Sequence, residues 1–113
     1  MHEMGVCDGI LKAAIEAATD QGAVKINSID ITVGELMQVV EESLQFAFEV
    51  LREDSMAAQA VLNVTFLPAE AHCLDCGTVF NRDLYDVKCP NCGSYLGELI
   101  QGRELRIDSI DID

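Results

Sequence analysis

The chain has 113 residues, half of them apolar, and a formal net charge of −13, which suits one small domain with at most a satellite lobe. Its seven basic residues are scattered among twenty acidic ones, so it lacks the clustered Lys and Arg that nucleic-acid backbones and anionic membranes select. We therefore expect neither nucleic acid nor membrane as a partner, and we interpret the acidity mainly as a source of solubility.

The compartment follows from the absence of a targeting pattern and from the cysteines. The chain opens without a basic n-region, and no apolar run approaches membrane-spanning length, so we expect a cytoplasmic protein. In a reducing compartment, five cysteines favour metal binding over a disulfide framework.

The first elements are expected to be a short edge strand over residues 1–5 and a helix that begins at Val6. The helix is indicated by apolar residues at the 3.6-residue period, and Gly22 is placed to end it. The apolar stripe comprises Cys7, Ile10, Leu11, Ala14, Ile15 and Ala18. Cys7 is therefore expected to be a buried core thiol rather than a nickel ligand.

A strand over residues 24–33 and a second helix are predicted next. The apolar phase of the strand slips between Ile26 and Ile29, which indicates a bulge. Thr32 and Glu35 have the spacing of a capping box, so the helix is expected to start there. Its predicted stripe is Leu36, Val39, Val40, Leu44, Ala47, Phe48 and Leu51, and an alternating strand follows over residues 61–67.

The last strand is predicted over residues 105–112, where Arg106–Ile112 nearly repeats Lys25–Ile31, phase slip included. Two such strands are expected to be neighbours in one sheet, with chance similarity as the alternative. The predicted class is α+β: a small mixed β-sheet with two packed helices plus an inserted zinc-ribbon lobe. Residues 1–68 with 99–113 would form the main domain, and residues 69–98 the lobe.

The lobe contains two Cys-x-x-Cys-Gly knuckles, at Cys73 and Cys76 and at Cys89 and Cys92. Each knuckle places two thiolates on one side of a tight turn, and the following Gly can adopt a positive φ. Four thiolates fill a tetrahedral coordination shell, so the site predicts a structural Zn²⁺ rather than a catalytic one. The small packing core around it is expected to comprise Val79, Phe80, Tyr85 and Tyr95.

Three other interpretations of these cysteines are weaker. Four reduced, buried thiols would not need the paired spacing, and a redox motif would need only one pair. A rubredoxin-like iron site has the same pattern, but such lobes are richer in aromatic residues, and iron would leave two thirds of the chain unexplained.

The amino terminus, Met1-His2-Glu3, contains the donors for a second metal site. The Met1 amine, the amide nitrogen and imidazole of His2, and an amide or carboxylate of Glu3 together offer four donors. Square-planar nitrogen donation suits Ni²⁺ or Cu²⁺ rather than zinc. Taken alone, an ordinary exposed terminus is the default interpretation. His72 is expected to face solvent, with support of the cysteine cluster as the alternative.

Taken together, these motifs resemble the HypA/HybF family of hydrogenase nickel-incorporation proteins over nearly the whole chain. The resemblance is carried by Met1-His2-Glu3, by the segments at residues 33–36 and 44–51, by the two knuckles, and by the segment at residues 102–110. Met4-Gly5 follows the opening motif where the family often has Leu, Tyr or Trp and then Ser, and His72 lies just before a knuckle where some members have a histidine just after one.

The resemblance implies a metallochaperone that binds Ni²⁺ at Met1, His2 and Glu3, with His2 essential. It implies a maturation GTPase of the HypB family and the large subunit of a [NiFe]-hydrogenase as partners, with urease served by some members. The alternative is a zinc-ribbon adaptor that binds proteins without nickel delivery. An enzyme is not expected, because no nucleophile or acid–base pair converges. The sequence leaves a homodimer, the role of His72 and the hydrogenase served open.

Overall fold

The computed structural model describes residues 3–113, which form two α-helices, one 3₁₀ helix and six strands. In chain order these are α1 (Glu3–Asp20), β1 (Ile26–Gly34), η1 (Glu35–Met37), α2 (Glu41–Leu51), β2 (Val61–Leu67), β3 (Glu70–Cys73), β4 (Val79–Asn81), β5 (Gly97–Gln101) and β6 (Leu105–Ile112). The chain divides into two compact units: Met1–Thr32, Val39–Thr65 and Arg106–Asp113 form the first, and Val33–Gln38 and Phe66–Leu105 the second. No helix in this described part is long and apolar enough to cross a membrane.

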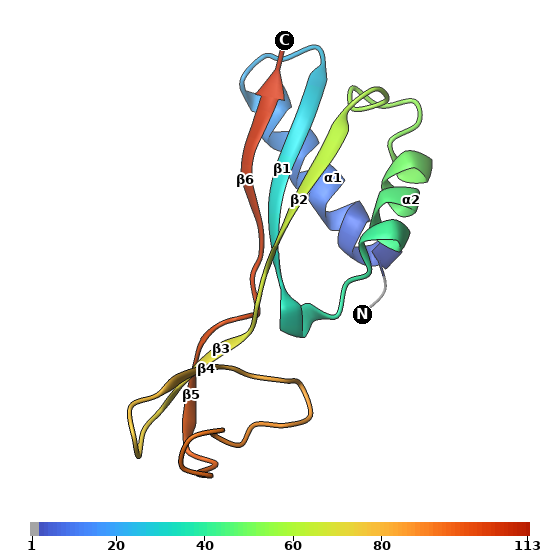
Figure 1. Ribbon diagram of the computed structural model, residues 1–113. Coiled ribbons are helices and arrows are strands. Elements are labelled where there is room, and N and C mark those ends of the chain that lie inside the picture. The colour runs from blue at the N-terminus through green and yellow to red at the C-terminus, as the bar shows by residue number, and fades with distance from the viewer. Residues whose placement is uncertain (1–2) are drawn as a thin grey trace. The chain divides into compact units, whose positions relative to one another are not determined.

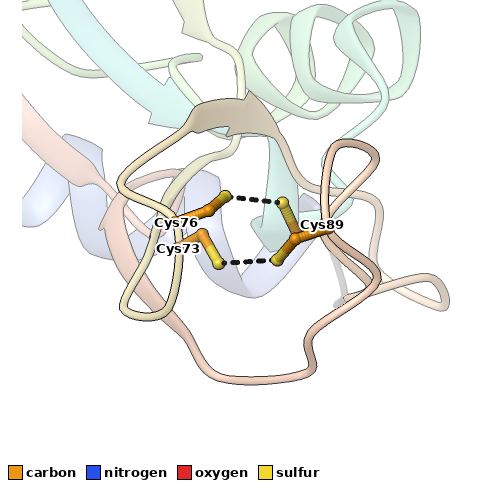
Figure 2. Close-up of side chains that lie close together, drawn as sticks. Cys73, Cys76 and Cys89 are labelled. Atoms are coloured by element: carbon orange, nitrogen blue, oxygen red, sulfur yellow. Dashed lines mark hydrogen bonds between the residues drawn. The ribbon is translucent and has the colours of Figure 1, made fainter.

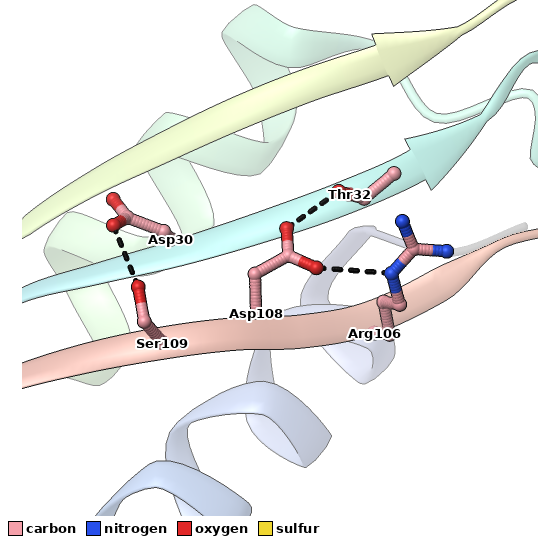
Figure 3. A network of polar contacts seen from close by, with 5 residues as sticks. All are labelled: Asp30, Thr32, Arg106, Asp108 and Ser109. Atoms are coloured by element: carbon pink, nitrogen blue, oxygen red, sulfur yellow. Dashed lines mark hydrogen bonds and ion pairs between the residues drawn. The ribbon is translucent and has the colours of Figure 1, made fainter.

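The first unit is built on a three-stranded sheet in the order β2-β1-β6, with α1 and α2 on one face (Figure 1). β1 and β2 run in the same direction and β6 runs opposite to them, so the sheet is mixed (Figure 3). The helices and β1 supply the apolar core, which includes Ile10, Leu11, Ile26, Ile29, Leu44 and Phe48. The predicted α+β class, with a mixed sheet and two packed helices, is confirmed.

The chain begins differently from the prediction. The edge strand expected over residues 1–5 is wrong in its described part, because residues 3–5 already belong to α1. A helix satisfies its backbone locally, whereas a terminal strand needs a sheet edge to pair with. Glu3 in the first turn also favours the helix through its charge. Gly22, at φ +73°, follows the end of α1 as predicted.

The repeated segments lie side by side, because β1 and β6 are neighbours in the sheet. The Asp30 carboxylate accepts hydrogen bonds from the Ser109 hydroxyl and the Asn63 amide, both at 2.8 Å, and so links all three strands. Thr32 donates to Asp108 at 2.5 Å, and Asp108 also accepts from Arg106 at 2.9 Å (Figure 3). These polar contacts fix the pairing of the two strands.

The predicted phase slip in β1 is also present. Ile26 and Ile29 are both 0 % exposed although they are three residues apart, which regular alternation does not allow. β6 repeats the feature, since consecutive Asp108 and Ser109 both bond to β1. The bulge itself stays a prediction.

The predicted capping box is wrong. Thr32 is 4 % exposed and lies in β1, and α2 begins only at Glu41, after the N-cap residue Val40, whose side chain makes no capping hydrogen bond. The Glu35 carboxylate instead accepts a hydrogen bond from the Ala69 amide at 2.7 Å. Tertiary partners thus replaced the local cap that the sequence offered.

The second unit contains an antiparallel sheet in the order β4-β3-β5, in which Ala71 pairs with Phe80 and Leu99. The sequence did not predict these three short strands. Gly34 and Gly102 approach closely in this unit: a Cβ added at Gly34 would lie 2.2 Å from the Gly102 carbonyl carbon. Only glycine fits there without displacing the backbone.

Candidate metal centre

The two knuckles bring four sulfur atoms together. The Sγ atoms of Cys73, Cys76, Cys89 and Cys92 all lie within 4.8 Å of one another. Those of Cys73 and Cys92, and those of Cys76 and Cys89, are 3.6 Å apart (Figure 2). A tetrahedral ion with metal–sulfur bonds of about 2.3 Å has sulfur–sulfur edges of about 3.8 Å. The side chains therefore outline a four-sulfur metal site.

The two knuckles have the same backbone structure. The amide of Gly77 donates to the carbonyl of Cys73, and that of Gly93 to the carbonyl of Cys89, both at 2.9 Å. Gly77 and Gly93 adopt φ values of 81° and 78°, as their positions predicted. In the left-handed region a side chain would be strained, so glycine lets each turn close around its pair of sulfurs.

The pKa values of two cluster thiols are shifted in opposite directions, by hydrogen bonds in one case and by desolvation and neighbouring sulfurs in the other. The side chain and backbone amide of Thr78, followed by the Asn91 side chain, lower the pKa of Cys76 to about 5. At Cys92 the Ser94 amide also favours the thiolate, but desolvation and the neighbouring cysteine sulfurs raise its pKa to about 12. The cluster therefore accommodates a thiolate, but further ionisation needs a cation to offset the accumulating negative charge.

Thr78 and Asn91 were not singled out from the sequence. The Thr78 hydroxyl oxygen lies 3.2 Å from the Cys76 sulfur, and the Asn91 amide donates to that sulfur at 3.6 Å. The available signal was their position, since Thr78 directly follows the first knuckle glycine and Asn91 lies within the second knuckle.

The buried core of the lobe shares only Phe80 with the predicted one. It comprises Ala71, Cys73, Phe80 and Cys89. Phe80 is buried as expected, but Val79, Tyr85 and Tyr95 are 54 %, 86 % and 70 % exposed, so their predicted burial is wrong. Alternation along β4 explains Val79, because its neighbour Phe80 takes the inward position. Half of this core consists of cysteines.

The predicted nickel site is only partly within the described residues. Met1 and His2 lie outside them, and Glu3 is the first residue of α1. The Glu3 carboxylate accepts a hydrogen bond from the Val40 amide at 3.4 Å, at the start of α2. Val40 caps α2 without a side-chain hydrogen bond, so Glu3 supplies a negative charge where that helix has unpaired N–H groups.

A pocket of about 570 Å³ lies beside Glu3 between the two helices. It is lined by Glu3, Met4, Glu42, Ser43, Phe46 and Ala47. Met4 is 47 % exposed and Phe46 is 66 % exposed, so the surface next to Glu3 is partly apolar.

Cys7 and His72 are the remaining cysteine and histidine of the described residues. Cys7 is 0 % exposed in α1, and its burial, followed by the charge of Asp8, raises its pKa to about 11. The prediction of a core thiol is confirmed. His72 lies on β3 next to Cys73, partly exposed and paired with Val79.

Known proteins match the chain along its whole length. Residues 1–112 match the family model described as hydrogenase/urease nickel incorporation, metallochaperone, hypA. The chain belongs to the HypA family. It is thus a member of a family of nickel metallochaperones for hydrogenase maturation, as the motifs suggested.

Individual relatives agree in sequence and in structure. The chain is 40 % identical over 114 residues to the hydrogenase maturation factor HypA of Alkalilimnicola ehrlichii, covering all of both chains. It is 36 % identical over 113 residues to that of Dehalococcoides mccartyi, covering 100 % of this chain and 95 % of the relative. It is similar to the solution structure of the Ni metallochaperone HypA from Helicobacter pylori, with TM-score 0.70, 30 % identity and coverage of 99 % and 97 %.

Proposed function

We propose that this protein binds Ni²⁺ at its amino terminus and delivers it to the large subunit of a [NiFe]-hydrogenase, without being an enzyme. The nickel donors would be Met1, His2 and Glu3, in a domain of residues 1–68 with 99–113. The zinc lobe, residues 69–98, would hold a structural Zn²⁺ on Cys73, Cys76, Cys89 and Cys92. The observation that carries this proposal is the family match over residues 1–112.

The proposed zinc site is supported by its geometry and donor set. Sulfur separations of 3.6 Å and the closed arrangement of four thiols suit a tetrahedral ion with no open position. Zinc would stabilise the lobe, and the four cysteines would be its only ligands. Elemental analysis of the purified protein tests the identity of the metal, because iron in the same site would give a coloured protein.

The start of α1 supports amide chelation of nickel. The first four N–H groups of an α-helix have no partner within the helix, and Glu3 is the first residue of α1. Its amide nitrogen can therefore lose a proton to nickel without breaking a helical hydrogen bond. The Glu3 carboxylate, which already contacts the Val40 amide, would support the position of the terminus.

The proposed partners follow from the family. Nickel would pass from this protein to the hydrogenase large subunit with the help of a maturation GTPase of the HypB family. The pocket of about 570 Å³ is lined by Glu3, one of the proposed nickel donors, and offers a partner both charged and apolar contacts. We further propose that the protein functions in the cytoplasm, and a homodimer is an option within the same proposal.

The deciding experiment is a nickel titration of the untagged, zinc-loaded protein, with its N-terminal residue verified by mass spectrometry. We expect tight binding that is lost in His2→Ala and retained in His72→Ala, which removes the chain's other histidine. Adding one residue before Met1 should weaken binding sharply, because the chelating amine is displaced.

The pH dependence provides a second arm of the same test. The amine and imidazole have ordinary pKa values of about 7.7–8.0 and about 6.5, so mild acid should release nickel before zinc. Equal nickel binding by the wild type and His2→Ala would exclude a nickel site at the amino terminus. A zinc-ribbon adaptor without nickel delivery would then account for the chain.

A further inference from the structure

The second unit carries a pocket of about 240 Å³ whose lining includes no cysteine. Two arginines, Arg82 and Arg103, line it together with Tyr95. The lining is completed by Ala71 on β3, by Val87, and by Gly97 and Leu99 on β5. Tyr95, Gly97 and Leu99 alternate along the chain. The pocket therefore lies on one face of the β4-β3-β5 sheet.

Neither of these arginine side chains has a polar partner within the described chain. Of the four arginines, Arg52 donates to the Ala60 carbonyl at 2.5 Å and Arg106 pairs with Asp108 at 2.9 Å. Over residues 3–113, the side chains of Arg82 and Arg103 have no hydrogen bond or ion pair. Two unpaired guanidinium groups thus share one pocket in a chain with twenty acidic residues.

The acidic residues nearest in sequence are engaged elsewhere. The carboxylates of Asp83, Asp86 and Glu104 each accept a hydrogen bond from a nearby backbone amide, at 3.3, 3.1 and 2.9 Å. None of them lines the pocket. Among the described residues, no carboxylate lines the pocket or forms an ion pair with either arginine, so an external anion can take that place.

The size and surroundings of the pocket narrow the class of anion. Its volume is below the roughly 300–1,000 Å³ of drug-sized ligand sites, and it suits one side chain or chain end. The guanidinium fork matches the planar geometry of a carboxylate, which it can bind with two parallel hydrogen bonds. The net charge of −13 opposes a polyanion, so the carboxylate should be surrounded by neutral or basic groups.

The exposed residues at the pocket favour a protein as the carrier of that carboxylate. Tyr95 is 70 % exposed and the adjacent Leu96 is 60 % exposed. Tyrosine and arginine together are enriched as anchors of protein–protein interfaces. We propose that the Arg82–Arg103 pocket is a docking site for a protein partner that presents one carboxylate within a neutral or basic segment. This site is independent of the proposed nickel donors.

The test is a titration of the ¹⁵N-labelled, zinc-loaded chain with the peptide acetyl-Lys-Leu-Glu-Leu-Lys-amide, followed by NMR. The matched probe is the same peptide with Gln in place of Glu. We expect the Nε–H signals of Arg82 and Arg103 and the amide signal of Tyr95 to shift with the Glu peptide only. Arg82→Gln and Arg103→Gln should each weaken binding about tenfold or more, since a charge-assisted hydrogen bond is lost.

The control variant is Lys88→Gln, which removes the same charge in the same unit but does not line the pocket. It should leave the affinity for the Glu peptide within about twofold, because the change is confined to long-range charge. The arginine variants should keep their zinc and dispersed amide signals. The Arg82 backbone amide, which donates to Ala69 at 2.8 Å, is retained in Arg82→Gln.

Three outcomes would overturn the proposal. If the Gln peptide binds equally well, the pocket does not recognise a carboxylate. If Lys88→Gln weakens binding of the Glu peptide as much as the arginine variants do, the effect depends only on net charge. Displacement of the Glu peptide by an equal concentration of inorganic phosphate would assign the pocket to a free anion. Nickel titration of Arg82→Gln keeps the two proposals separate, because its terminal donors are unchanged.

Discussion

The two units of this chain are stabilised in different ways. The first buries large apolar side chains from two helices and a sheet, among them Phe48 and Leu44 at 1 % and 0 % exposure. The second has a buried cluster of four residues, of which two are cysteines, while its tyrosines are exposed. A unit with so little apolar burial depends on cross-links or metal for its folding energy. One chain therefore combines a unit with a large apolar core and a unit whose buried cluster is half cysteine.

Removing the metal should have the largest effect, and it should be confined to the second unit. Metal binding contributes about 10–16 kcal/mol in comparable zinc peptides, so chelation or Cys73→Ser should unfold β3–β5. Amide NMR signals of that segment should lose their dispersion while those of α1 and β1 persist. Cys7→Ser, a substitution of the cysteine outside the cluster, should retain stoichiometric metal. Loss of structure throughout both units would contradict the expectation that only the second unit needs metal to fold.

Deleting core volume in the first unit should have the next largest effect. Phe48 is 1 % exposed and its ring also lies 5.6 Å from the Arg52 guanidinium. Phe48→Ala should lower the free energy of unfolding by about 3–5 kcal/mol in urea denaturation followed by helical circular dichroism. Phe46→Ala, at a site 66 % exposed, should change it by about 0.5 kcal/mol or less. Equal losses in both variants would mean that α2 packs differently.

The buried thiol of the first unit should differ from the four of the second in its response to alkali. The folded-state pKa of Cys7 is raised to about 11 by burial, whereas in the unfolded chain a thiol titrates near 8.5. Below that lower value both states hold the proton. As the pH rises toward 11 the unfolded chain ionises first, so stability is lost.

Cys7→Ala should therefore show a smaller decline in stability between about pH 8.5 and pH 11 than the wild type. In the folded protein at neutral pH, Cys7 should also resist iodoacetamide, as judged by mass spectrometry, and react after denaturation. Rapid modification of the native protein at Cys7 would show that the core opens there.

The smallest effect should come from the polar contacts between β1 and β6. The Thr32 hydroxyl, followed by Arg106, holds the pKa of Asp108 below its ordinary value. The contribution of the ionised Asp108 to stability is fully present above the unfolded-state pKa of about 3.9. It is lost as the pH falls through the lowered folded-state pKa. Asp108→Asn should flatten this acid decline, followed by NMR signals of β6. Asp111→Asn, at a neighbouring exposed acid of β6, serves as the control, and an identical change in both variants would contradict the role assigned to the Thr32–Asp108 contact.

Several elements were predictable because their signals are local. The helical period of α1, the positive φ at Gly22, Gly77 and Gly93, and the strand ended by Pro68 each depend on a few consecutive residues. The pairing of β1 with β6 was also visible, because the two segments have similar sequences and the same phase slip. The spacing of the cysteines indicated one four-sulfur cluster before any geometry was known.

The start of α2 and the use of Thr32 and Glu35 were decided by tertiary structure. Their capping-box spacing is a real local preference, but Asp108 and Ala69 offer partners from 76 and 34 residues away. The three strands of the cysteine lobe are short, and β3 pairs with β5 across more than twenty residues of chain, which no local pattern indicates.

The sequence by itself determined the fold class, the family and the four cysteines that cluster, since these depend on residue type and spacing. Only the tertiary structure showed that Tyr95 is exposed and that Arg82 and Arg103 share a pocket in which neither side chain has a polar partner among residues 3–113. The physical reason is that burial and ion pairing depend on which distant side chains meet. A chain with twenty acidic residues gives no sequence-level indication that two arginines are left unpaired.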